Sequence, residues 1–261
     1  MLAAGCRDVV LEPTVERARA WAERGRLLGG ESGGVRPDGF DFGNSPAEYA
    51  ARDLGGAAIA FATTNGTKAL MLAARAPVVL AGCLLNGQAA ARFAHREAVE
   101  RGLDLQIVCA GREEGSAVAL DDSFCAGYMV SLILEIGAYG LGRPEGSGRL
   151  ADSALVALRL YEHYRFDCET AEEAALAAFA DATSSRVLGR HGLGADVRYC
   201  ARADTLEVVP RARLDGEVVR VERAVADVRL ASEHFVGCGA AGAEWGLSAD
   251  SAANSTDRGR T

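Results

Sequence analysis

Residues 57–67 read AAIAFATTNGT, an apolar run that ends in a cluster of threonine, asparagine and glycine. The apolar run predicts a buried β-strand, and the residues from Lys68 onward predict a helix. Asn65 and Gly66 favour a tight turn between strand and helix, because both residue types tolerate a positive φ. The backbone N–H groups and threonine hydroxyls of such a turn can bind an anion; the alternative is an ordinary turn capped by Thr67.

Strand and helix patterns alternate on both sides of this stretch, which predicts a three-layer α/β/α protein with a mixed sheet. Further strands are expected at residues 8–11, 77–83 and 105–109. Helices are expected at residues 14–24, 87–101, 121 onward, 150–166 and 170–189. Short strands at 197–201 and 206–209 and a hairpin turn at Asp215-Gly216 predict a β-rich C-terminal part. The glycine-rich residues 27–34 fit neither kind of element.

The chain is expected to hold one α/β domain over residues 1–236, with two similar subdomains as an open alternative. Residues 237–261 are rich in glycine, alanine and serine, and they predict a disordered tail.

Composition excludes several functional classes. The 261 residues carry a net charge of -8, which argues against a nucleic-acid partner. No apolar run is long enough to cross a membrane and no signal pattern opens the chain, so a soluble cytoplasmic protein is expected. Walker A, Cys-x5-Arg, Asp-x-Asp, nucleophile-elbow and Cys-x-x-Cys motifs are absent from the sequence. Metal-assisted chemistry on an anionic ester remains.

The stretch GFDFGNSP, residues 39–46, carries the second signal. Ser45 and Pro46 predict the start of a helix, and Glu48 completes a capping box. Asp41 lies just before this start and can ligate Mg²⁺, unless it only makes a local turn bond. The turns after the strands at 57–62, 77–83 and 105–109 are expected to meet at one edge of the sheet and converge on one anion.

Six motifs, GGES-GG, GFDFGNSP-E, TTNGTKAL, LL-N, CAG and LDDSFCAGY, follow one another in the order and approximate spacing of the 2-phosphosulfolactate phosphatase family. The chain resembles this family from about Cys6 to Pro210. The resemblance implies a phosphatase-like α/β domain and a Mg²⁺-dependent phosphoric monoester hydrolase. Its reaction would convert (2R)-2-phospho-3-sulfolactate to 3-sulfolactate and phosphate, a step in coenzyme M synthesis.

The resemblance also implies roles for residues at matching motif positions. Mg²⁺ would be held by Glu31 and Asp41, and catalysis would involve Asp41, Asn65 and Asp122. The anionic substrate would contact Asn44, Ser45, Thr64, Gly66, Thr67 and Asn86. From the residues alone, the default role of Asp121 and Asp122 is favourable placement in the helix dipole, with a metal role for one of them as the alternative.

Two departures from the family pattern keep alternatives open. Ser32 stands where the family usually has an arginine, and Arg36 or Arg112 would have to replace that anion clamp. Residues 1–5 align with the helix after the family's opening segment, DVLRATTT, so an N-terminally truncated domain is expected. A phosphatase for another small phosphate ester and a non-catalytic anion-binding relative are the alternatives. A homodimer that covers exposed strand edges is a further expectation.

Overall fold

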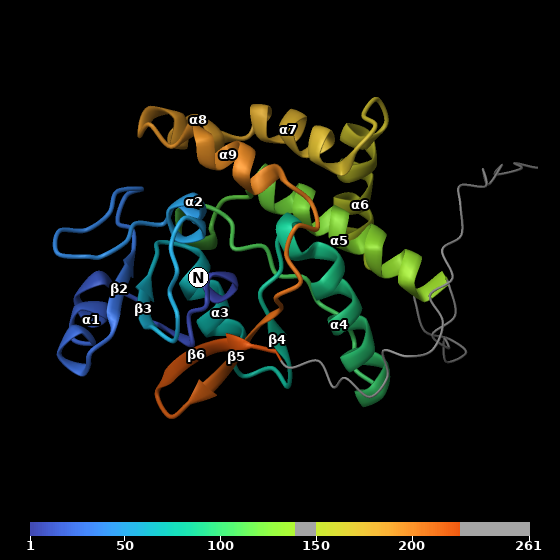
Figure 1. Cartoon of the computed structure of the whole chain (residues 1–261). Coiled ribbons are helices and arrows are strands. Elements are labelled where there is room, and N and C mark those ends of the chain that lie inside the picture. The colour runs from blue at the N-terminus through green and yellow to red at the C-terminus, as the bar shows by residue number, and fades with distance from the viewer. Residues whose placement is uncertain (139–149, 225–261) are drawn as a thin grey trace, which may run out of the picture. The chain divides into compact units, whose positions relative to one another are not determined.

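The computed structural model of the chain describes residues 1–138 and 150–224, which contain a mixed β-sheet and many helices (Figure 1). The strands are β1 (Asp8–Leu11), β2 (Leu27–Gly30), β3 (Ala58–Ala62), β4 (Val79–Leu80), β5 (Pro210–Asp215) and β6 (Val218–Arg223). The α-helices are α1 (Val15–Arg19), α2 (Pro46–Ala50), α3 (Gly66–Ala73), α4 (Gly87–Arg101), α5 (Leu120–Ala138), α6 (Asp152–Arg165), α7 (Ala171–Asp181), α8 (Thr183–Arg190) and α9 (Gly194–Ala201). Short 3₁₀-helices are η1 (Leu2–Ala4), η2 (Ala22–Arg24), η3 (Leu84–Asn86) and η4 (Glu113–Gly115).

The strands lie in the order β2-β3-β1-β6-β5-β4. β2 and β1 both pair with β3 in parallel, with Leu28 and Val10 opposite Ala60. The other three strands join by antiparallel pairing, and the predicted hairpin links β5 to β6. The sheet is therefore mixed, as the sequence predicts, and β4 runs opposite to β3.

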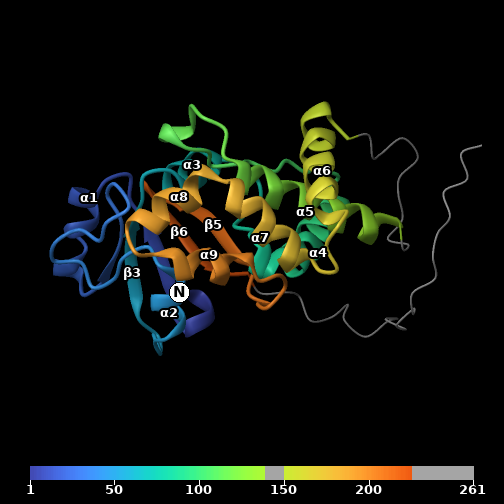
Figure 2. The same ribbon diagram turned by 90° about the horizontal axis from the view of Figure 1, so that it is seen from above.

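Helices cover both faces of the parallel part of the sheet, which confirms the α/β prediction. Side chains of β3 alternate between two cores, because successive residues of a strand point to opposite faces. Ile59 and Phe61 pack with Tyr49 of α2 on one face, while Ala60 packs against Ala18 of α1 on the other. A third core lies among the helices α4 to α9, which group together beside the sheet (Figure 1, Figure 2).

Tertiary contacts overturn several local predictions. Residues 27–30 form a strand, because their glycines let the backbone of β2 lie close to Phe61 and Tyr49. Residues 105–109 do not form a strand; no neighbouring strand pairs with them in the described ranges, and Val108 is exposed.

The C-terminal part is less β-rich than predicted. Residues 197–201 belong to α9, and 206–209 belong to no strand. The helix predicted at 170–189 is divided, because Ala182 is extended between α7 and α8. The tail predicted at 237–261 lies outside the described residues. Among the residues that the structure describes, no helix is long and apolar enough to span a membrane.

Candidate functional site

Glu31 joins the ends of the two adjacent parallel strands β2 and β3. Its Oε1 accepts a hydrogen bond from the Thr64 N–H at 2.6 Å, and its Oε2 accepts one from the Gly34 N–H at 2.8 Å. Because both carboxylate oxygens bind backbone donors, the side chain is fixed in direction. The carboxyl ends of parallel strands are where α/β proteins bind ligands.

A cavity of about 300 Å³ opens at this point and is called the Glu31 cavity below. Its lining comprises Pro13, Thr14, Val15, Glu16, Glu31, Ser32, Ala62, Thr63, Thr64, Lys68 and Glu114. The side chain of Lys68 lies in the first turn of α3 and pairs with Glu114, with 2.8 Å between Nζ and Oε1. The cavity thus combines carboxylates, hydroxyls and one amine, which suits a small polar ligand.

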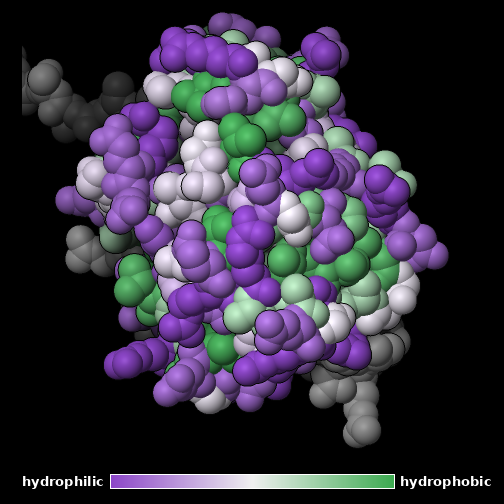
Figure 3. Space-filling view, turned by 90° about the vertical axis from the view of Figure 1, so that its left-hand side faces the viewer, coloured by the Kyte–Doolittle hydropathy of each residue, from purple (hydrophilic) through white to green (hydrophobic). Residues whose placement is uncertain are grey.

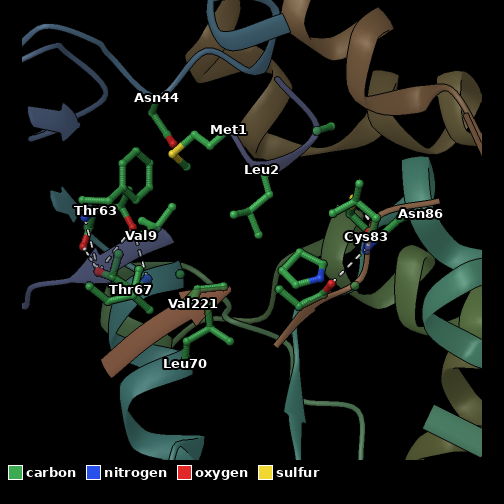
Figure 4. Close-up of a pocket in the computed structure, with 18 of the residues that line it drawn as sticks. Met1, Leu2, Val9, Asn44, Thr63, Thr67, Leu70, Cys83, Asn86 and Val221 are labelled. Atoms are coloured by element: carbon green, nitrogen blue, oxygen red, sulfur yellow. Dashed lines mark hydrogen bonds between the residues drawn. The ribbon is translucent and has the colours of Figure 1, made fainter. Parts of the chain in front are cut away.

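A second cavity, of about 430 Å³, is mostly apolar (Figure 4). The predicted site residues Asn44, Gly66, Thr67 and Asn86 line this cavity rather than the first. Figure 4 shows Thr67 and Thr63 at one side of it and Asn86 with Cys83 at the other. The structure therefore divides the predicted substrate residues between two cavities that share only Thr63 in their linings.

Thr67 and Asn86 are both engaged within the protein. The buried Thr67 hydroxyl donates to Thr63 O at 2.9 Å, so it caps the turn, as the alternative interpretation holds. The Asn86 amide accepts from Cys83 N–H at 2.9 Å and donates to Val208 O at 3.0 Å.

The structure brings the three predicted turns together only in pairs: the 63–67 turn shares the apolar cavity with Asn86 and the Glu31 cavity with Glu114. β4 runs opposite to β3, so the rule for the carboxyl ends of parallel strands does not apply to the turn that carries Asn86, although Asn86 and Thr67 line one cavity. Residues 105–109 form no strand, so the third turn does not follow a strand end at all.

The stretch at 39–46 holds local structure together. Asp41 Oδ2 accepts from the Leu28 N–H at 2.8 Å, and Asp41 lines neither cavity. Ser45 caps α2 as predicted and also donates to the buried Asp196 of α9 at 2.7 Å. The predicted capping box is not made, because the Glu48 carboxylate accepts instead from Gly43 N–H.

Asp122 lies in the first turn of α5, and its Oδ2 accepts from the Gly111 N–H at 2.7 Å. Burial raises the pKa of this carboxyl, the Gly111 hydrogen bond opposes the shift, and the neighbouring Asp121 carboxylate adds to it. Asp122 therefore anchors the loop that brings Glu114 to the Glu31 cavity.

The free energy of unfolding of the Asp122→Asn variant, relative to that of the wild type, is expected to increase as the pH rises. The folded protein holds the Asp122 proton more tightly than the unfolded chain, so wild-type stability falls as pH rises from about 3.9 toward the raised pKa. Asparagine cannot ionise and still accepts from Gly111 N–H. Urea unfolding of both proteins across this range tests the idea, and a difference that does not change with pH would contradict it.

The carboxylates fit Mg²⁺ only in part. Within residues 1–138 and 150–224, no three His, Cys, Asp or Glu side chains are grouped so that they could hold a metal ion. Glu31, Asp41 and Asp122 therefore do not form a three-carboxylate site. Of these three carboxylates only Glu31 lines the Glu31 cavity, and one carboxylate with several waters is a normal Mg²⁺ environment.

Lys68 is a site residue that the sequence prediction missed. Neither Arg36 nor Arg112 lines the Glu31 cavity; their nearest carboxylates belong to Glu48 and Glu113, at 3.7 and 3.9 Å. The available signal was the position of Lys68 directly after TTNGT, one residue into the predicted helix.

A mixed sheet whose parallel strands end at a polar cavity defines an α/β protein with a cavity where such proteins bind ligands. A model of the family described as 2-phosphosulpholactate phosphatase matches residues 1–214. The chain belongs to this phosphatase family.

Similar proteins cover most of the chain, and each is named "Probable 2-phosphosulfolactate phosphatase". The protein from Thermus thermophilus is 37% identical over 226 residues, which are 85% of this chain and 86% of that protein. The one from Carboxydothermus hydrogenoformans is 33% identical over 221 residues, 84% of this chain and 82% of that protein. One from Clostridium perfringens is 32% identical over 219 residues, with shares of 83% and 79%.

Proposed function

We propose that this protein is a Mg²⁺-dependent 2-phosphosulfolactate phosphatase, which hydrolyses (2R)-2-phospho-3-sulfolactate to 3-sulfolactate and phosphate. The family and the names of its similar proteins support this reaction. The observation that carries the proposal is Glu31, held by two backbone N–H groups beside Thr64 and Lys68 in one cavity. A cytoplasmic location and a place in coenzyme M synthesis belong to the same proposal.

The residues of the Glu31 cavity divide the work. Glu31 would hold Mg²⁺ together with waters, and the ion when bound would withdraw charge from a phosphoryl oxygen. Thr64 would present its hydroxyl to the anion and Lys68 would supply a positive charge, while the Thr63 hydroxyl bonds with Thr67 inside the turn. Asn65 positions the neighbouring loop, because its Oδ1 accepts from the Glu114 N–H at 3.0 Å.

A second candidate is the hydrolysis of a different small phosphate ester. Ser32 lines the cavity at the position where the family usually has an arginine. Serine has no charge and a short side chain, so it cannot bind an oxyanion in the bidentate way that arginine does. A substrate with one acidic group fewer would suit this lining.

Phosphate release from a panel of monoesters tests both candidates. We expect the highest kcat/KM with 2-phospho-3-sulfolactate, and a loss of at least about 100-fold when EDTA removes Mg²⁺. Full turnover in EDTA would contradict the metal requirement. Faster hydrolysis of 2-phospholactate, which lacks the sulfonate, would favour the second candidate, and no release from any ester would exclude both.

A further inference from the structure

The ion pair between Lys68 and Glu114 lies in the lining of the Glu31 cavity. Both residues line the cavity, and 2.8 Å separates Lys68 Nζ from Glu114 Oε1. Among the described residues that line the cavity, Lys68 is the only one with a basic side chain. The Glu114 carboxylate is thus paired with the only basic side chain in the described lining of the cavity.

Glu114 reaches Lys68 from a compact loop, residues 110–117. Arg112 and Ala117 pair with each other through two backbone hydrogen bonds, and Gly111 is held by Asp122. The tip of the loop meets the 63–67 turn through Glu114, whose N–H donates to Asn65 and whose side chain pairs with Lys68. Glu114 therefore makes both of these contacts, one to Asn65 and one to Lys68.

The backbone of this tip is strained. Glu113 and Glu114 have φ values of 52° and 59°, in the left-handed region that side-chain-bearing residues avoid. Such a conformation persists only when surrounding contacts hold it. The two contacts of Glu114 add to the loop's own hydrogen bonds from Gly115 and Ser116, so losing the ion pair weakens the restraint on the tip.

The ion pair is also weak enough to exchange. The Glu114 side chain is 69% exposed and that of Lys68 is 36% exposed. Exposed ion pairs contribute little, whereas a hydrogen bond from an ammonium to a phosphate or sulfonate is charge-assisted and strong. An oxyanion in the cavity would therefore displace Glu114 from Lys68.

We propose that Lys68 is the oxyanion-recognition residue of the Glu31 cavity and that Glu114 is an internal placeholder, displaced when a phosphoryl or sulfonate group binds. The identity of the substrate in this proposal rests on the proposed function, whereas the binding of an oxyanion to Lys68 does not. Binding removes the carboxylate from the cavity and leaves the Lys68 charge facing the ligand. The 110–117 loop then loses its contact with Lys68.

Thermal unfolding with inorganic phosphate as the probe tests the recognition role. Titrations are run with Mg²⁺, against chloride at matched ionic strength, and the phosphate concentration at half the maximal rise in Tm is compared. Lys68→Met is expected to raise this concentration at least about tenfold. Glu114→Gln is expected to lower it about twofold to fivefold, because Lys68 is then free.

Arg75→Met is the matched control, because Arg75 carries the same charge just after α3 and lines neither cavity. It should leave the half-maximal concentration unchanged. Equal concentrations for wild type and Lys68→Met would overturn the recognition role. A higher concentration for Glu114→Gln than for wild type would overturn the placeholder role, and this arm does not depend on the folding of Lys68→Met.

Hydrogen exchange gives a second measurement, because amide exchange in the loop would not become faster on phosphate binding if the ion pair stayed in place. Amides of residues 113–116 should exchange faster when phosphate saturates the wild-type protein, although ligands ordinarily slow exchange. Slower exchange would overturn the displacement. Methanesulfonate in place of phosphate shows which oxyanion loses more affinity in Lys68→Met, and thereby which group of the substrate meets Lys68.

The proposed function and this inference can fail separately. A protein that hydrolyses no ester but shows the expected responses to phosphate retains the recognition site and loses the proposed reaction. An active phosphatase whose Lys68→Met variant keeps its wild-type KM and phosphate response retains the reaction and overturns the inference.

Discussion

Glu31→Gln is expected to reduce kcat at least about 100-fold, with the fold retained. The carboxylate accepts from Thr64 N–H and Gly34 N–H with its two oxygens. Glutamine keeps the size but offers one oxygen and one NH₂ group, so one of the two backbone donors would face another donor. The substitution also removes the carboxylate charge that we propose as the Mg²⁺ ligand; Glu16 and Glu114 also line this cavity.

Steady-state phosphate release at several Mg²⁺ concentrations measures this effect, and circular dichroism checks the fold. Glu23→Gln is the matched control, because Glu23 is an exposed carboxylate of η2 that lines neither cavity. Glu31→Asp separates charge from reach, since the shorter side chain keeps the charge but cannot span both N–H groups. Wild-type turnover in Glu31→Gln would remove this residue from the site.

Gly30→Ala is expected to lower the free energy of unfolding by more than about 3 kcal/mol. Gly30 has a φ of 140°, which residues with a Cβ rarely adopt. A Cβ there would lie 2.0 Å from Ala62 O, inside the backbone of the neighbouring strand. Because β2 and β3 cannot move apart without breaking the hydrogen bonds between them, a small local movement cannot relieve the clash.

Urea denaturation followed by circular dichroism measures the loss. Gly33→Ala is the matched control: Gly33 also has a positive φ, of 62°, but no atom lies within 4 Å of an added Cβ. This control should cost only about 1 to 2 kcal/mol. Equal losses in the two variants would show that the clash with Ala62 O is relieved and that only the backbone conformation matters.

Local sequence signals predicted the elements that local interactions decide. The strand at 58–62 and the helix start at Ser45-Pro46 were correct, as was the hairpin at 215–216. Residues 27–30 could not be predicted in this way, because their strand depends on pairing with β3, which lies about thirty residues further on. Residues 105–109 have strand propensity but no neighbouring strand in the described ranges.

The site could be predicted less well than the fold. The motif resemblance found Glu31 and Thr64, which the structure places in one cavity. The resemblance also implied Asn86, which lines the second cavity, because β4 runs opposite to β3 and strand direction is a property of the whole sheet. Lys68 and Glu114 meet across 46 positions of sequence, a distance at which no local pattern indicates a contact.

The way Glu31 is held has a consequence for divergence within the family. Its hydrogen-bond partners are main-chain groups, which every residue except proline supplies, so a substitution at Thr64 need not move the carboxylate, whereas the φ of 82° favours glycine at position 34. Side chains around it, such as Ser32, can then change from one relative to another while the reactive group stays in place. If Glu31 has the proposed role, single substitutions around it can therefore change substrate preference while the position of its carboxylate is kept.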